Sequence, residues 1–232
     1  MKNRRITIRR SLGLICVVAL ILAAIFHAQL LTRLAGLLIH DQTVPASGFV
    51  VILDGDRRFD IAAELVSRSG FEGVLVFRER LRPLARCGIV PPGHEVAERE
   101  LRSRGLAPGQ ISVIKSEGRF LWDAADRLGT WLDQRDDDLV VLTDQFGSHR
   151  VRYVVDQTLP AELAARVHVS AMVDRRFNKH DWWKHRIGCR AFFSSCVRMA
   201  YARIIGRPHP DDIVDWDPDA FERELRKAVA DR

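Results

Sequence analysis

The sequence predicts an α/β fold: a doubly wound, Rossmann-like three-layer sandwich with a mainly parallel five-stranded sheet, preceded by one N-terminal transmembrane helix. Two observations predict the domain. Short, fully apolar runs such as Phe49–Leu53 alternate with segments whose apolar residues recur at helical spacing, and the turns between them are short. Such runs are typical of parallel strands that helices cover on both faces. A third observation, a long apolar segment near the N-terminus, predicts the membrane helix.

Residues 11–39 contain no acidic residue and a single strong base, Arg33, and they follow the basic head MKNRRITIRR. About 20 apolar residues cross a bilayer as a helix, and Ser11–Leu31 provides that length. Cations next to a span stay on the cytoplasmic side. We therefore expect a cytoplasmic head at 1–10, an anchor with an apolar extension at 11–39, and a main domain outside the cytoplasm.

A cleaved signal peptide and a buried core helix are the alternatives for this segment. Signal peptides have a shorter apolar core that ends at a small-x-small cleavage site. The nearest cleavage candidates, around Ala24 and Ala28, are interrupted by Phe26 and His27. The cations of the head argue against a core helix. The sequence therefore favours a retained single-pass anchor in the cell membrane.

Composition limits the function of the remaining residues. Hydrophobic residues make up 47% of the chain, which excludes global disorder. The net charge of +6 is concentrated in the head, so it reflects membrane topology, and we expect no nucleic-acid partner. Cys87, Cys189 and Cys196 show no metal-ligand spacing; Cys87 could pair with one of the other two, or all could be free thiols.

The elements follow in alternating order. A polar linker at 40–47 precedes an α/β domain at 48–174, and a tail at 175–232 contains an aromatic basic loop and C-terminal helices. The expected strands are 49–53, 73–77, 111–114, 139–143 and 166–172. The expected helices of the domain are 58–69, 95–104, 120–132 and 149–157, followed in the tail by 188–205 and a charged helix at 218–230.

Charged side chains follow the predicted strands. Ligands of open parallel sheets bind beyond the carboxyl ends of the strands, near the point where the strand order reverses. Residues expected there include Asp54, Gly55, Asp56, Arg58, Arg78, Glu79, Glu117, Arg119, Thr143, Asp144, Gln145, Ser148, His149 and Arg150. Guanidinium groups and helix N-termini favour phosphate and carboxylate groups. The alternative is that these residues cap helices and pair with one another.

Several functions lack their signatures. The chain has no GxGxxG, GxxxxGK[ST] or GxSxG motif, so we expect neither NAD binding, nor P-loop chemistry, nor serine hydrolysis, and no cofactor. His180, Asp181 and His185 are irregularly spaced, so we expect no metal. Trp182 and Trp183 would either rest on the membrane interface or pack on the edge of the sheet.

Three segments suggest a family: VVILDGDRRFDIAAEL, SEGRFLWDAA and TDQFGSHRV. In this order, over about residues 48–172, the chain resembles the membrane-anchored, envelope-associated YdcF/SanA/ElyC-like family, whose function is largely unknown. The positions that match family motifs are Arg58, Arg119, Asp123, Thr143 and Arg150. The chain departs from the pattern at Phe120, Leu121 and Ala124, which replace polar residues, and at Gly147, which stands where the family has His.

The resemblance and the charged residues together imply a membrane-anchored protein of the cell envelope, with a role in envelope or polysaccharide biogenesis. We expect it to bind an anionic ligand, a phosphorylated glycan or lipid-linked intermediate. The expected ligand-binding residues are Gly55, Arg58, Arg119, Thr143 and Arg150, and the candidate bases or hydroxyl-orienting acids are Asp54, Asp56 and Asp123. The alternatives are a non-catalytic envelope interaction protein with a degenerate pocket, and nucleotide or S-adenosylmethionine binding. The sequence identifies no protein partner.

Overall fold

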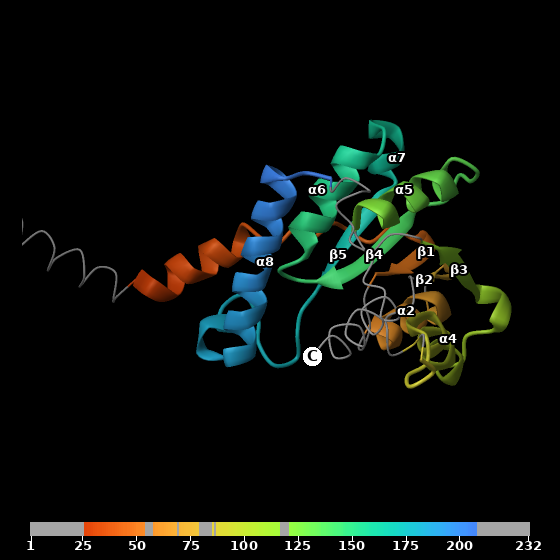
Figure 1. Ribbon diagram of the computed structural model, residues 1–232, viewed down its shortest axis with the longest axis horizontal. Helices are drawn as coiled ribbons and strands as arrows, with labels where there is room; N and C mark the ends of the chain where they lie inside the picture. Colours follow the sequence, from red (N-terminus) through yellow and green to blue (C-terminus); the bar gives the residue numbers. More distant parts are fainter. Residues whose placement is uncertain are drawn as a thin grey trace, which may run out of the picture.

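Five parallel strands form one sheet in the computed structural model, which describes residues 26–53, 58–68, 70–78, 85, 87–116 and 121–207 (Figure 1). The strands are β1 (Ser47–Ile52), β2 (Gly70–Arg78), β3 (Ile111–Lys115), β4 (Leu139–Asp144) and β5 (Val167–Met172). Their order across the sheet is β3-β2-β1-β4-β5, and every pairing is parallel. The predicted α/β class with a parallel five-stranded sheet is therefore confirmed.

Helices cover both faces of the sheet. On one face, α2 (Arg58–Arg68) and α4 (Gly93–Ser103) bury their apolar sides against alternate strand residues such as Val50 and Leu142. On the other face, α5 (Leu121–Leu132), α6 (Ser148–Thr158) and the short α7 (Ala161–Ala165) pack against the intervening residues, such as Val51 and Val141. Successive strand side chains point to opposite faces, so the two apolar clusters alternate along each strand.

The strand order reverses between β1 and β4. The chain leaves β1 into α2, which covers one face, and leaves β4 into α6, which covers the other. The first turns of α2 and α6 therefore flank the carboxyl ends of two neighbouring strands. This is the place where open parallel sheets bind ligands.

A third apolar cluster lies beyond the sheet. It joins the end of an N-terminal helix (residues 26–36), the loop between β4 and α6, and the long α8 (Arg186–Ile204). The ring of Phe146 lies at its centre, 5.9 Å from that of Phe177 and 5.7 Å from that of Phe192. Trp182 is buried in this cluster, and its indole donates to the carbonyl of Leu31 at 3.4 Å. Trp182 thus packs on α8 and the N-terminal helix, and not on the sheet edge or at a membrane interface.

The segment predicted to be a linker is attached to the domain. The backbone N–H of Gln42 donates to the carbonyl of Val169 at 2.9 Å, and its side-chain oxygen accepts from the N–H of Val169 at 2.9 Å. Asp41 accepts from the N–H of Ala171 at 2.9 Å. These residues therefore cover the outer edge of β5, where unpaired backbone groups would otherwise be exposed.

Most predicted bounds agree with the structure to within a few residues. Three short elements were not predicted: α7 and the 3₁₀ turns η1 (Pro108–Gln110) and η2 (Trp182–Lys184). The described part of the chain contains no helix that combines the length and apolar character needed to cross a bilayer. Most of the predicted span at 11–31, and all of the charged helix at 218–230, lie outside the described residues.

Gly73 is a position where the sheet tolerates no side chain. A Cβ there would lie 2.4 Å from the carbonyl oxygen of Gln110, a rigid backbone atom. We expect Gly73→Ala to lower the free energy of unfolding by about 1–3 kcal/mol, because overpacking forces backbone shifts. The control is Gly93→Ala at the start of α4, where a Cβ would meet nothing within 4 Å. Denaturant unfolding of both variants tests this, and equal stability would contradict the close approach.

Candidate functional site

Arg58, the first residue of α2, reaches across the point where the strand order reverses. Its guanidinium donates to the carbonyl of Leu142 in β4 at 3.5 Å and lies 3.9 Å from the Asp144 carboxylate. The side chain is 13% exposed, so its charge lies partly shielded from water beside the first turn of a helix. A guanidinium at the N-terminus of a helix favours a bound anion.

Asp144 ends β4 and is 58% exposed. Its carboxylate accepts from the backbone N–H of Gly147 at 2.8 Å, which fixes the turn into α6. A Cβ at position 147 would lie only 2.6 Å from this carboxylate. A side chain at position 147 would therefore require the Asp144 carboxylate to shift.

The segment before the sheet covers the start of α6. The N–H of His149 donates to the carbonyl of Leu38 at 3.2 Å, and its Nδ1 lies 2.6 Å from the carbonyl of Leu37. A carbonyl only accepts, so Nδ1 carries the proton. This contact orients the His149 ring. The N-terminus of α6 is thus partly occupied by the chain itself, whereas α2 presents Arg58.

His40 belongs to the same cover. Its N–H donates to the hydroxyl of Ser148 at 2.8 Å, and that hydroxyl donates to the carbonyl of Gln145 at 2.7 Å. Burial lowers the pKa of His40, and the nearby charges of Arg152 and His149 lower it further. The imidazole therefore stays neutral at physiological pH. Arg150, a predicted ligand-binding residue, is partly buried in the first turn of α6.

The loop after β4 holds buried polar side chains. Thr143, a predicted ligand-binding residue, is buried in β4, so its side chain does not lie on an open rim. The next buried side chain is Gln145, which is 4% exposed, and its amide nitrogen has no hydrogen-bond partner. A buried donor without a partner costs about 1–3 kcal/mol. Such a group directly after the strand that bears Asp144 is a candidate donor to a ligand.

Asp123 lies away from Arg58. Its carboxylate accepts from the hydroxyl of Ser116, which directly follows β3, and this attaches the first turn of α5 to the far side of the sheet. Neighbouring strands are about 4.8 Å apart, so β3 and β4 are separated by roughly 14 Å. Trp122, the residue before Asp123, packs edge-to-face on Tyr153, with ring centroids 6.4 Å apart. The contacts of Asp123 and Trp122 join β3, α5 and α6, and neither residue has a contact with Arg58 among those described.

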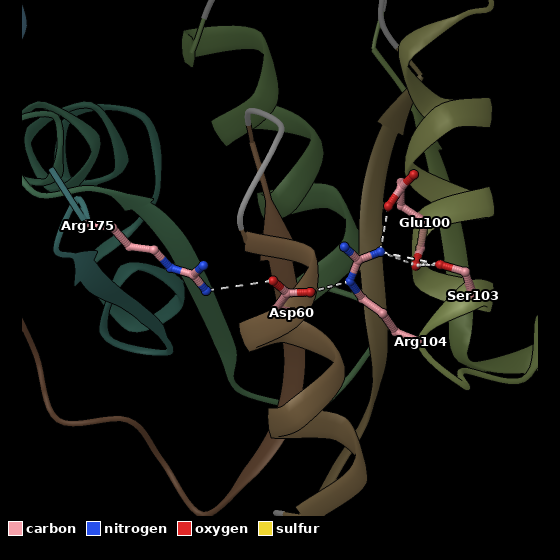
Figure 2. Close-up of polar contacts among 5 residues, drawn as sticks. All are labelled: Asp60, Glu100, Ser103, Arg104 and Arg175. Atoms are coloured by element: carbon pink, nitrogen blue, oxygen red, sulfur yellow. Dashed lines mark hydrogen bonds and ion pairs between the residues drawn. The ribbon is translucent and has the colours of Figure 1, made fainter. Parts of the chain in front are cut away.

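An ion-pair network holds α2 in place (Figure 2). Arg104, just after α4, donates to Asp60 in the first turn of α2 at 2.5 Å and to Glu100 at 2.6 Å. Arg175, beyond β5, lies 4.0 Å from the same Asp60 carboxylate on its other side. The hydrogen bond from Arg104 lowers the pKa of Asp60, and Asp60 in turn raises the pKa of Arg104. This network fixes the helix turn that carries Arg58.

The structure thus brings together only part of the predicted site. Arg58 and Asp144 meet at the β1–β4 junction, whereas Asp123 lies at β3. Four of the expected ligand-binding residues and candidate acids, Asp54, Gly55, Asp56 and Arg119, lie outside the described residues, as do Glu79 and Glu117 of the predicted rim. The sequence predicts Gln145 at the end of the fourth strand, and sequence reasoning missed Arg104. No pattern shows that the amide of Gln145 is buried without a partner, and none marks a partner for Arg104.

Comparison with known proteins identifies no relative. No family model, no curated protein and no solved structure matches the chain. Within the described ranges, no three His, Cys, Asp or Glu side chains are grouped so that they could hold a metal ion. The functional argument therefore depends on the geometry of the β1–β4 junction, where the Arg58 guanidinium lies 3.9 Å from the Asp144 carboxylate and the next residue, Gln145, has a buried amide.

Gln145→Met tests whether the amide of Gln145 is unsatisfied. Methionine has a similar shape and no donor, so we expect the free energy of unfolding to rise by about 1 kcal/mol. Gln134→Met is the control, because Gln134 is exposed and its replacement should change stability by less than about 0.5 kcal/mol. A loss of stability in Gln145→Met, measured by urea unfolding, would show that the amide makes a favourable interaction.

Asp60→Asn tests the Arg104 network through its pH dependence. Because the pKa of Asp60 is lowered in the folded state, its contribution to stability is present above about pH 4 and is lost as the pH falls through the folded pKa. We expect the variant to be less stable than the natural protein at pH 7 and to approach it in stability below pH 4. Denaturant midpoints between pH 7 and 3 measure this, with exposed Asp136→Asn as the control. A difference that stays constant over this range would contradict the assignment.

Proposed function

We propose that this chain is a membrane-anchored protein of the cell envelope, whose α/β domain binds an anionic, phosphate-bearing ligand at the β1–β4 junction. The observation that carries the proposal is Arg58, which extends from the first turn of α2 to the end of β4. The expected ligand class is a phosphorylated glycan or lipid-linked intermediate, which is consistent with a role in envelope polysaccharide biogenesis.

The charges at the junction support an anion site of moderate strength. The Asp144 carboxylate lies 3.9 Å from the Arg58 guanidinium, which is at the outer limit for an ion pair. A phosphate group could approach that guanidinium in a bidentate geometry, which the carboxylate does not adopt here. The dipole of α2 would add to this attraction. In this proposal Asp144 is a weak internal competitor that limits the affinity for anions.

The remaining residues of the proposal come mainly from segments outside the described residues. Gly55, with Asp54 and Asp56, precedes α2, and Arg119 precedes α5. We assign Gly55 and Arg119 to phosphate binding, and Asp54 and Asp56 to hydroxyl groups of the ligand. Arg150 at the start of α6 would complete the cationic side. In this proposal Thr143, which is buried in β4, and Asp123, which accepts a hydrogen bond from Ser116, do not contact the ligand directly.

The membrane location in the proposal rests on sequence. The apolar run at 11–31 and the cations before it favour a single span with the head in the cytoplasm. The resemblance to the YdcF/SanA/ElyC-like family, whose members are anchored in the envelope, agrees with that topology. The α/β domain would then stand next to the outer surface of the membrane, within reach of lipid headgroups.

A nucleotide is the second candidate ligand, and one observation favours it. The strand order β3-β2-β1-β4-β5 is that of the dinucleotide-binding fold, in which a pyrophosphate binds at the same junction. The glycine-rich turn of that fold is missing. Fold alone does not decide function, so nucleotides belong in the ligand panel beside sugar phosphates and polyprenyl phosphates.

Two variants should change anion affinity in opposite directions. We expect Arg58→Ala to weaken binding of a phosphate-bearing ligand by about tenfold or more, because it removes a charge-assisted hydrogen bond. We expect Asp144→Asn to tighten binding by about threefold or more, because it removes a competing charge about 4 Å away. Thermal-shift titration of the full chain in detergent with sugar phosphates, polyprenyl phosphate and ATP provides the measurement.

Arg68→Ala is the matched control, since Arg68 ends the same helix, is exposed and pairs only locally with Glu64. If no anion stabilises the protein, the alternative of a non-catalytic interaction protein is favoured. If a ligand binds equally well to Arg58→Ala, the site lies elsewhere.

A further inference from the structure

The long helix α8 is apolar on two opposite sides. One side, with Gly188, Phe192, Met199 and Ala202, is buried in the third apolar cluster. At 3.6 residues per turn, the opposite side carries Phe193, Val197, Tyr201 and Ile204. Of these, Phe193 is 62%, Val197 69% and Ile204 80% exposed. A contiguous exposed apolar row on a helix is typical of an interaction surface, and among the described residues α8 has apolar neighbours on only its other side.

The exposed side of α8 is also basic. Arg186, Arg190, Arg198 and Arg203 are all exposed, and the helix has no acidic residue. Arg186 and Arg190 lie in the same sector as the exposed apolar row, and the other two flank it. An exposed apolar row bordered by arginines is the pattern of helices that lie in the headgroup region of anionic bilayers. Arginine side chains can bury their stems there and keep their charge at the surface.

The N-terminal helix extends this surface. Phe26, Leu30 and Leu34, spaced by four residues, are 49%, 55% and 40% exposed. In Figure 1 this helix crosses α8 and leads away from the sheet. In sequence it directly continues the apolar run at 11–25. If that run carries the N-terminal helix into a bilayer along the helix axis, then α8, which crosses this helix, lies along the bilayer surface.

We propose that the exposed side of α8, together with the exposed row of the N-terminal helix, rests on the surface of an anionic lipid bilayer and holds the domain in one orientation. The inference rests on the membrane location proposed above and is independent of the ligand. Charge complementarity argues for lipid rather than a second copy. Two α8 helices in contact would bring eight arginines together, and α8 has no acidic residue to pair with them.

A single fluorescent label measures this contact in the full chain. Cys16, Cys87, Cys189 and Cys196 are replaced by serine, and the environment-sensitive dye NBD is attached through Val197→Cys. The control label is at Arg99→Cys, an exposed position of α4, on the far side of the sheet domain. Each protein is reconstituted in vesicles of phosphatidylcholine with or without phosphatidylglycerol, and nitroxide-labelled lipids quench the dye.

We expect the dye at position 197 to be quenched several-fold more than the dye at position 99 in anionic vesicles, and less in neutral ones. The double charge reversal Arg190→Glu with Arg198→Glu should reduce quenching at position 197 to the control level, while the protein still sediments with the vesicles. Because both arginines are exposed, we expect the variant to keep the fold, and circular dichroism tests this.

Other results would overturn the proposal. Quenching at position 197 that equals the control means that α8 faces water. If the dye is shielded from water but not quenched by the lipids, protein covers α8 instead. The covering part is the acidic segment 208–232 if deleting that segment exposes the dye. It is a second copy of the chain if the shielding increases with protein concentration. Quenching insensitive to lipid charge and to the reversal excludes the anionic lipid. Failure to sediment with vesicles at all contradicts the proposed anchor and not the ligand site.

Discussion

The burial of a parallel sheet on both faces is the constraint on which the rest of this structure depends. Parallel strands must be joined by crossovers, and here the crossovers place α2 and α4 on one face and α5, α6 and α7 on the other. The change of face between β1 and β4 leaves two helix N-termini beside neighbouring strand ends. The same requirement that gives β1 and β4 their uniformly apolar sequences therefore also creates the junction at which Arg58 and Asp144 meet.

The fold could be predicted from sequence because its signals are local. A run such as residues 139–143 has no polar face, and a strand of that kind fits only between two layers of helices. Arg58 was predicted for a similar reason, since it opens a helix directly after a strand. What could not be predicted depends on long-range contacts: Arg104 meets Asp60 across 44 residues, and His149 meets the carbonyl of Leu37 across 112.

The expected cluster of Arg58, Asp123 and Thr143 shows the limit of reasoning from strand ends alone. All three follow or end strands, but each strand end has its own position across the sheet, and β3 lies three strands from β4. Thr143 is buried although β4 continues past the end of β1, where it is still paired with β5. Strand order and relative strand length, which one sequence does not reveal, decide which residues share a site.

The hydrogen bonds of residues 37–42 have a mechanical consequence. The chain passes from the N-terminal helix to α6 and then to the edge of β5 with backbone contacts at Leu37, Leu38, His40 and Gln42. These hydrogen bonds restrict movement of the N-terminal helix relative to the sheet. If the N-terminal helix continues into a membrane anchor, as proposed, its direction would set the height and tilt of the β1–β4 junction above the membrane.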